Sequence, residues 1–160
     1  MNSLVAHFVD AWSTLYSNSA ALRTLVAFVH IAGLVGGGGA AIAADRATLL
    51  ATRRGAVVAR NQLLSIHHTH RIVVLGLAAV IVSGLLLFAA DIDTYAVSKV
   101  FWLKMAMVAL LMINGAVLVR VAGANRAADE RVRRTLRWTS ATSLCLWFLI
   151  TLAGAGLPNI

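Results

Sequence analysis

The chain has 160 residues, of which 60% are hydrophobic and only 12% are charged. A soluble globular domain is about 45–50% apolar and about 25% charged, so this composition excludes a disordered chain and argues against a soluble enzyme domain. Fourteen Lys and Arg against six Asp and Glu give a net charge of +8, which taken alone would fit a nucleic acid or a membrane surface. The positions of these cations favour the membrane.

The first predicted element is an amphipathic helix over residues 3–17. Seven apolar side chains recur there at helical spacing, while His7, Asp10 and Thr14 fall on the opposite face. Such a helix lies along the membrane surface, with Trp12 and a nearby tyrosine at headgroup depth. We interpret it as an anchor that packs against the helices that follow.

Four later segments are apolar over the roughly 20 residues that a spanning helix needs. They cover residues 22–44, 65–90, 97–121 and 136–157. The connections between them are short, so consecutive helices should pack side by side. We therefore predict an all-α fold in one domain: an integral membrane, antiparallel four-helix bundle that the N-terminal interfacial helix precedes.

The cationic residues indicate an orientation. Eleven of the fourteen fall in two stretches, residues 46–71 and 120–137, whereas the short connection over residues 91–99 carries few. Positively charged loops stay in the cytoplasm. We therefore expect a multi-pass protein of the bacterial inner (cytoplasmic) membrane with both termini on the outer, periplasmic side. The basic loops account for the net charge, and we expect no nucleic-acid partner.

Two ionisable side chains fall well inside predicted spans, His30 in the first and Lys104 in the third. At 1.5 Å per residue, His30 lies about 12 Å and Lys104 about 6–10 Å from the outer ends of their helices. Met107 follows about one turn deeper on the same stripe as Lys104. Ionisable groups inside the hydrocarbon are costly and are candidates for function, and histidine is the commonest metal ligand.

Both side chains have a plainer interpretation. Lys104 can extend its amine to the headgroups, and His30 can form a hydrogen bond between helices. Three more side chains reach the same level of the predicted bundle and could join a site there: Ser83, Trp147 and Thr151.

The residues after His30 are unusually small. Gly33 is followed by four consecutive glycines at positions 36–39, and Gly33, Gly37 and Gly38 share the helix face of His30. This face has two interpretations. A neighbouring helix can approach it closely, or a porphyrin plane can lie on it.

A second group of histidines, His67, His68 and His70, lies near the inner end of the second span. His67 and His70 are three residues apart and share a helix face, so they are weak candidate metal ligands. A structural zinc site needs four ligands, and binding of lipid phosphates at the inner interface is the favoured alternative. His70 and His30 differ in depth by about 18 Å, so they cannot be opposite ligands of one iron within one subunit.

No carboxylate falls inside a predicted span, because Asp45 and Asp91 come directly after the first and second spans. The serines and threonines of the fourth span can bond back to their own helix. The sequence therefore argues against a protease, a proton pump or an acid–base hydrolase.

Two stretches resemble known membrane proteins. FVHIAGLVGGGGAAIAADR, residues 28–46, looks like the first helix of CopD-like copper-resistance membrane proteins and of HemJ-type protoporphyrinogen oxidases, in which a histidine is followed within a few turns by glycine. VSGLLLFAADIDTYAVSKVFWLKMAMVALLMINGAVLVR, residues 82–120, is similar to their shared stretch, where a helix ends in Ser-Gly, crosses a short outer loop and enters a helix carrying Leu-Lys. The resemblance covers about a third of the chain.

The two branches of this resemblance imply different ligands. The HemJ branch implies haem b, with His30 as the iron ligand and Lys104 as the partner of a propionate or a substrate carboxylate. The CopD branch implies copper, for which thioether sulfurs such as that of Met107 are suitable ligands. The sequence lacks the tryptophan before the glycine and the closing Leu-Pro-Arg of the HemJ branch.

We expect a haem b-binding membrane protein of electron transfer or haem-linked redox chemistry, with a quinone or a redox protein as partner; it would then be a membrane oxidoreductase. The candidate cofactor-binding residues are His30, Lys104, Met107 and His70. The alternatives are a CopD-like copper-handling protein and a cofactor-free accessory subunit. We also expect a homo-oligomer, with a dimer favoured, because a small apolar bundle with a glycine-rich face has surface to pair.

Overall fold

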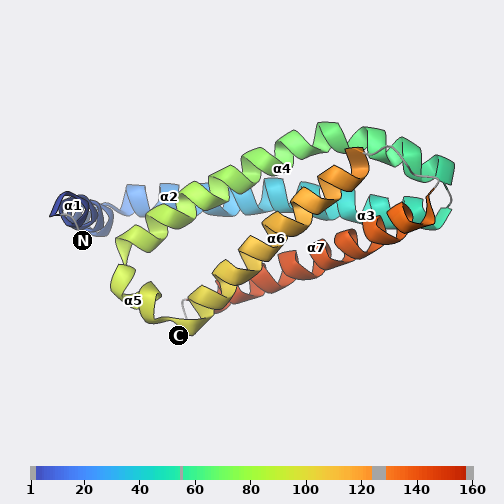
Figure 1. The fold of residues 1–160 in the computed structure, drawn as a ribbon. Coiled ribbons are helices and arrows are strands. Elements are labelled where there is room, and N and C mark those ends of the chain that lie inside the picture. Colours follow the sequence, from blue (N-terminus) through green and yellow to red (C-terminus); the bar gives the residue numbers. More distant parts are fainter. Residues whose placement is uncertain (1–2, 55, 124–128, 158–160) are drawn as a thin grey trace.

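The computed structural model describes residues 3–54, 56–123 and 129–157, and their side chains over residues 6–54, 71–121 and 129–157. Nearly all of these residues are helical, and no strand occurs among them. In chain order the elements are α1 (Ser3–Asn18), α2 (Ala20–Gly33), the π-helix η1 (Leu34–Gly38), α3 (Gly39–Arg54), α4 (Ala56–Ala90), α5 (Ile92–Val97), α6 (Lys99–Gly123) and α7 (Glu130–Gly156) (Figure 1). The predicted all-α fold is confirmed.

Within the described residues, four helical stretches are long and apolar enough to cross a membrane: Ala20–Arg54, Arg71–Ala90, Lys99–Val121 and Glu130–Gly156. The last three overlap the segments expected from the sequence. The first differs, since it runs through Asp45 to Arg54 instead of ending at residue 44. Residues 47–54 are mostly good helix formers and include neither proline nor glycine, so nothing in the sequence stops the helix at the charges.

The first stretch is one rod in which α2, η1 and α3 follow without a break. Four consecutive glycines lie in it, and glycine costs about 1 kcal/mol per residue in a helix interior relative to alanine. Packing compensates for this cost: a Cβ placed on Gly76 of α4 would lie 2.4 Å from the Cα of Gly37. The two backbones therefore touch, which only glycine at both positions allows.

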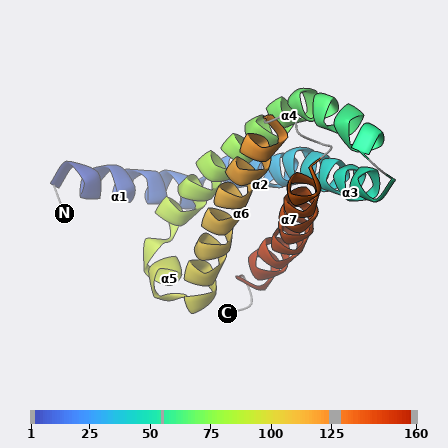
Figure 2. The ribbon, with the colours of Figure 1, turned by 45° about the vertical axis from the view of Figure 1, so that its right-hand side comes forward.

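Consecutive long helices run in alternating directions, and α3 packs on both α4 and α7 while α6 packs on α7 (Figures 1 and 2). The buried core lies where α3, α6 and α7 meet. Its members are apolar side chains with little exposed surface: Ala41, Leu111, Leu146, Trp147 and Ile150. Many large apolar side chains outside this core are exposed, as on a surface that faces lipid.

The N-terminal helix α1 turns away sharply from α2, as Figure 1 shows, where α1 is seen nearly end-on while α2 runs across the view. It is held to α4 by two hydrogen bonds: Trp12 Nε1 donates to the Leu86 carbonyl at 2.9 Å, and the Ser13 hydroxyl donates to the Ala90 carbonyl at 2.9 Å. Helix α1 is thus an anchor that packs against the helices that follow, as expected. Its position along a membrane surface stays a prediction.

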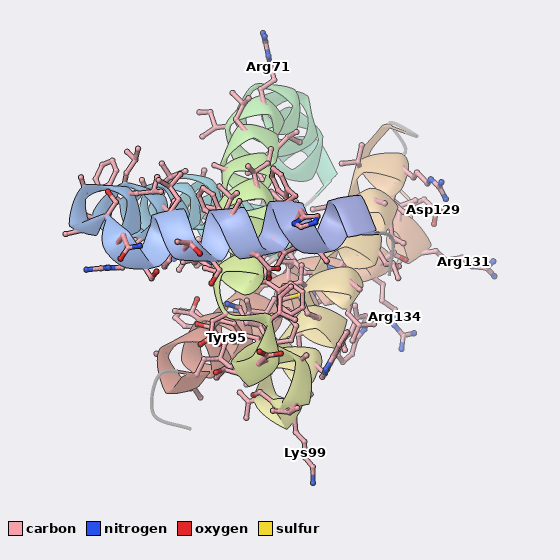
Figure 3. All side chains as sticks on the ribbon, turned by 90° about the vertical axis from the view of Figure 1, so that its left-hand side faces the viewer. Arg71, Tyr95, Lys99, Asp129, Arg131 and Arg134 are labelled. Carbon is pink, nitrogen blue, oxygen red and sulfur yellow. The ribbon has the colours of Figure 1, made fainter. Side chains whose placement is uncertain are left out.

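Charged side chains project away from the helices, as Arg71, Lys99, Arg131 and Arg134 do in Figure 3. The stretch expected to be the first basic loop is largely helical, because Arg46, with Arg53 and Arg54, belongs to α3. Among the described side chains, the only ion pair joins Arg133 and Glu130 within α7.

Candidate functional site

His30 of α2 forms a hydrogen bond with α4. Its Nδ1 lies 3.0 Å from the hydroxyl oxygen of Ser83. That hydroxyl lies 2.5 Å from the Ala79 carbonyl, and a serine hydroxyl has a single proton to give. The proton of Ser83 is therefore engaged with the backbone, and the Nδ1–H of His30 donates to Ser83. The Val80 backbone also lies within hydrogen-bonding reach of the ring. In the neutral imidazole, donation by Nδ1–H leaves the lone pair on Nε2.

Glycines in neighbouring helices make room for both basic side chains of this region. A Cβ on Gly84 would lie 3.4 Å from His30 Cε1, and a Cβ on Gly154 of α7 would lie 3.2 Å from Lys104 Nζ. The ammonium of Lys104 is also near enough to His30 to interact with it electrostatically. We call His30, Ser83 and Lys104 the His30 cluster; it joins α2, α4 and α6.

The other side chains expected at this level go elsewhere. Met107 and Trp147 belong to or pack against the apolar core. Thr151 is exposed, and its hydroxyl donates to the Trp147 carbonyl of its own helix at 2.8 Å. The structure therefore brings His30, Ser83 and Lys104 together, as the depths in the sequence suggested, and packs Met107 against the core.

The glycine face below His30 is filled by α4. A Cβ on Gly33 would lie 2.9 Å from the Gly76 carbonyl oxygen, and one on Gly37 would lie 2.7 Å from the Gly76 Cα. Of the two interpretations of this face, close helix packing is confirmed and the porphyrin plane is wrong. Because α4 covers this face, the glycines no longer support pairing with a second copy of the chain through it.

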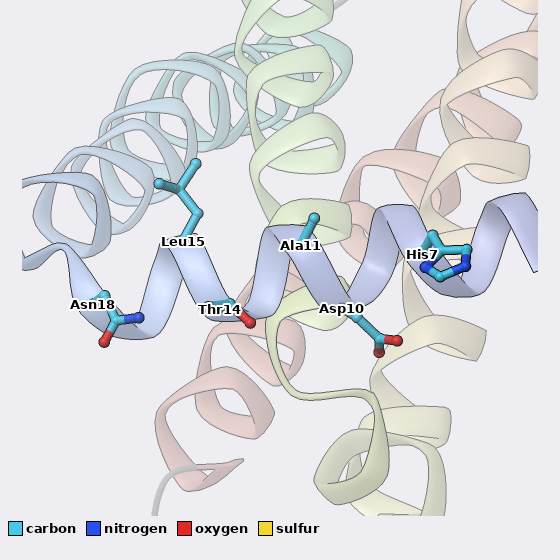
Figure 4. Close-up of a pocket in the computed structure, with 6 residues that line it drawn as sticks. All are labelled: His7, Asp10, Ala11, Thr14, Leu15 and Asn18. Carbon is cyan, nitrogen blue, oxygen red and sulfur yellow. The ribbon is translucent and has the colours of Figure 1, made fainter.

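Of the other four histidines, the structure describes the side chain of His7 alone. The candidate ligands His67 and His70, with His68, fall outside the described side chains. His7 lies on the exposed surface of α1, where an open hollow along that single helix is lined by His7, Asp10, Ala11, Thr14, Leu15 and Asn18 (Figure 4). Among the residues that the structure describes, no three His, Cys, Asp or Glu side chains group as ligands of a metal ion.

The structure contains a second polar site that was not expected from the sequence. It lies toward the end of the helices at which α6 ends and α7 begins. Asp45, expected at the end of a span, is only 3% exposed in α3. Its carboxyl group faces the hydroxyls of Ser143 and Ser140 in α7. The Ser140 hydroxyl, however, reaches hydrogen-bond geometry on no described acceptor, so its contact with the carboxyl group is loose.

This second site borders a cavity of about 460 Å³ between α3, α4, α6 and α7, which Asp45 and Ser143 line together with apolar side chains. Two features of the sequence could have indicated this second site. Helix-forming residues continue on both sides of Asp45, so the helix need not end there. Ser140 and Ser143 are three residues apart and therefore lie on one face of their helix.

The His30 cluster can act as a ligand site. A histidine that binds a metal usually donates its other N–H to an oxygen acceptor, which fixes its tautomer and orientation, and His30 has this arrangement. Lys104 adds a nearby cation for an anionic group. No protein-family model, no curated protein and no solved structure matches this chain.

Proposed function

We propose that this chain is a membrane protein that binds haem b through His30. The observation that carries the proposal is the 3.0 Å contact of His30 Nδ1 with Ser83. It turns the imidazole so that Nε2 keeps its lone pair, which is the requirement for an axial ligand of haem iron. Haem bound there would supply one-electron redox chemistry.

Lys104 supports an anionic cofactor. Its stem lies against Gly154 of α7, and none of the described acidic side chains forms an ion pair with it. An ammonium inside hydrocarbon is costly without an opposite charge. A propionate of haem, or the carboxylate of a substrate, would provide that charge beside His30.

The glycine face cannot hold the porphyrin, because α4 fills it. The cofactor would instead lie on the side of His30 that faces Lys104, and Lys104 stays the residue expected to contact it, whereas Met107 packs against the core. The Lys104 ammonium is a hydrogen-bond donor and would also suit an oxygen of a quinone as electron partner.

The membrane context is part of the same proposal. We propose that the four apolar stretches form an antiparallel bundle in the bacterial inner membrane, with the arginine-rich ends in the cytoplasm and both termini outside. His30 and Lys104 would then lie in the outer half of the bilayer. Pairing into a dimer remains a prediction, and another face than Gly33–Gly37 would have to provide its interface.

The test is haem content per chain, measured in protein purified in detergent from cells supplied with iron and a haem precursor. We expect stoichiometric haem in the wild type and none in His30→Ala. His7→Ala, which changes an exposed histidine of α1, is the matched control and should keep full haem. Helix content and elution volume establish that each variant is folded.

Two milder variants separate ligation from a purely structural hydrogen bond. Ser83→Ala should keep the axial ligand but lower haem affinity by about 10–100-fold, the usual effect of losing such a partner. Lys104→Gln should retain haem with weaker affinity. Full haem in His30→Ala would contradict the proposal, as would a wild-type protein that carries copper and no porphyrin.

A further inference from the structure

The cavity beside Asp45 has a polar wall and apolar walls. Asp45 of α3 and Ser143 of α7 form the polar wall, and Leu77, Leu111 and Trp147 are among the residues that form the rest. Its volume of about 460 Å³ falls in the range of about 300–1,000 Å³ that is typical of sites for small organic molecules. It lies between four helices, a usual place for such sites.

Asp45 brings an uncompensated acid to this cavity. The side chain is 3% exposed, and no described cation forms an ion pair with it. A buried carboxyl group requires a partner, and the nearest polar groups are the two serine hydroxyls of α7. Each hydroxyl can donate only one hydrogen bond, so the carboxylate can accept further ones. A cationic group that enters the cavity would provide them.

Ser140 shows that the surroundings of Asp45 are incompletely satisfied. Its side chain is 0% exposed, and its hydroxyl reaches full hydrogen-bond geometry with no partner among the described residues. A buried hydroxyl without a partner costs about 1–3 kcal/mol. Ser140 faces Asp45 one turn before Ser143 on the same side of α7 but does not line the cavity, so it supports the carboxyl group from behind.

Arg120 and Trp147, which also line the cavity, help to decide which class of ligand it binds. Arg120 also lines the cavity, but it is exposed at the last turn of α6, where water screens its charge. Asp45 is buried, and its field acts in a lower dielectric. The carboxylate therefore dominates inside the cavity, and Trp147, which lines it, is the aromatic residue type that attracts cations most strongly.

We propose that the cavity between α3, α4, α6 and α7 binds a lipophilic organic cation, whose charged group meets Asp45 and Ser143 and whose apolar body lies against Leu77, Leu111 and Trp147. This site is separate from the His30 cluster, and it does not depend on haem. It gives the chain a ligand site nearer the arginine-rich end of the helices.

The test is equilibrium binding of tetraphenylphosphonium to the full-length protein in detergent, with neutral triphenylphosphine oxide as the matched uncharged probe. We expect saturable binding of the cation to the wild type and at least tenfold weaker binding to Asp45→Asn. Ser143→Ala should weaken binding by a few-fold. Asp93→Asn, which changes an exposed carboxylate of α5, is the control and should bind as the wild type does.

A second variant keeps the test decisive if Asp45→Asn does not fold. Gly115 lines the cavity, and no described atom lies within 4 Å of a Cβ placed on it. Gly115→Leu should therefore fill the cavity without a clash, keep the thermal stability and abolish cation binding. Wild-type affinity in a folded Asp45→Asn or Gly115→Leu, or equal binding of the neutral probe, would overturn the proposal.

Discussion

The two polar sites of this molecule differ in how their groups are satisfied. At the His30 cluster, the imidazole N–H donates to Ser83, whose own proton is given to the Ala79 carbonyl. At the second site, the Asp45 carboxyl group meets two hydroxyls loosely, one of them without a hydrogen bond, beside a cavity of about 460 Å³. The first is a closed chain of hydrogen bonds between two touching helices, and the second is open and incomplete.

The helix contacts explain this difference. The π-helix η1 touches α4 through Gly37 and Gly76, and the close packing of this rod on α4 brings His30 of α2 against Ser83. At the second site a large side chain lies between the helices, since the Trp147 ring of α7 packs against Gly38 of η1 and also lines the cavity. Glycines on both sides thus accompany the closed site, whereas a tryptophan borders the open one.

The largest expected effect comes from the ring that borders the cavity. Trp147 is buried in the core, and truncation of a buried tryptophan costs about 3–5 kcal/mol. Trp147→Ala should therefore lower the free energy of unfolding by this amount in a denaturation titration followed by circular dichroism. Trp138→Ala, at a residue that is 66% exposed, is the control and should change it little. Similar losses in both variants would contradict the placement of the core.

A somewhat smaller effect should follow from separating α2 and α4. The added Cβ of Gly76→Ala would lie 2.4 Å from the Gly37 Cα, and overpacking of this kind costs about 1–3 kcal/mol. The variant should unfold at a lower temperature and lose the geometry of His30. Gly36→Ala adds the same methyl group where no described atom lies within 4 Å. If it destabilised the protein as much, the close contact of α2 and α4 would be wrong.

The smallest effect is expected between α6 and α7. Asn114 Nδ2 donates to the Thr139 carbonyl at 2.9 Å, and hydrogen bonds between spanning helices contribute about 0.6 kcal/mol on average, with a maximum near 1.7. Asn114→Ala should lower the free energy of unfolding by about this amount and leave the haem content unchanged. A loss of haem in this variant would mean that the His30 cluster depends on the α6–α7 contact.

The sequence predicts the helices, and it predicts that His30, Ser83 and Lys104 reach one level, because depth along a long apolar helix follows from residue number. The role of His30 stays a prediction. The end of the first span could not be placed in this way. A charged pair such as Asp45 and Arg46 usually ends a span, and only the tertiary contact with Ser140 and Ser143 shows that the carboxyl group is buried. The glycine run was likewise compatible with either a neighbouring helix or a porphyrin. Only the position of Gly76 opposite it shows that a helix lies there.

Other features depend on contacts that no pattern in the chain encodes. Met107 lies on the helix stripe of Lys104, yet it packs against the core, because the rotation of α6 is set by its packing on α7. Gly154, which makes room for the Lys104 amine, is fifty residues away in sequence and carries no signal of its own.

The most direct test of the central claim is the optical difference spectrum, dithionite-reduced minus oxidised, of the wild-type protein purified from cells supplied with iron and a haem precursor. If His30 is an axial ligand of haem b, the spectrum will contain a Soret band and split visible bands that respond to reduction. A flat spectrum from such cells would contradict the account and leave the hydrogen bond between His30 and Ser83 as a contact that only joins two helices.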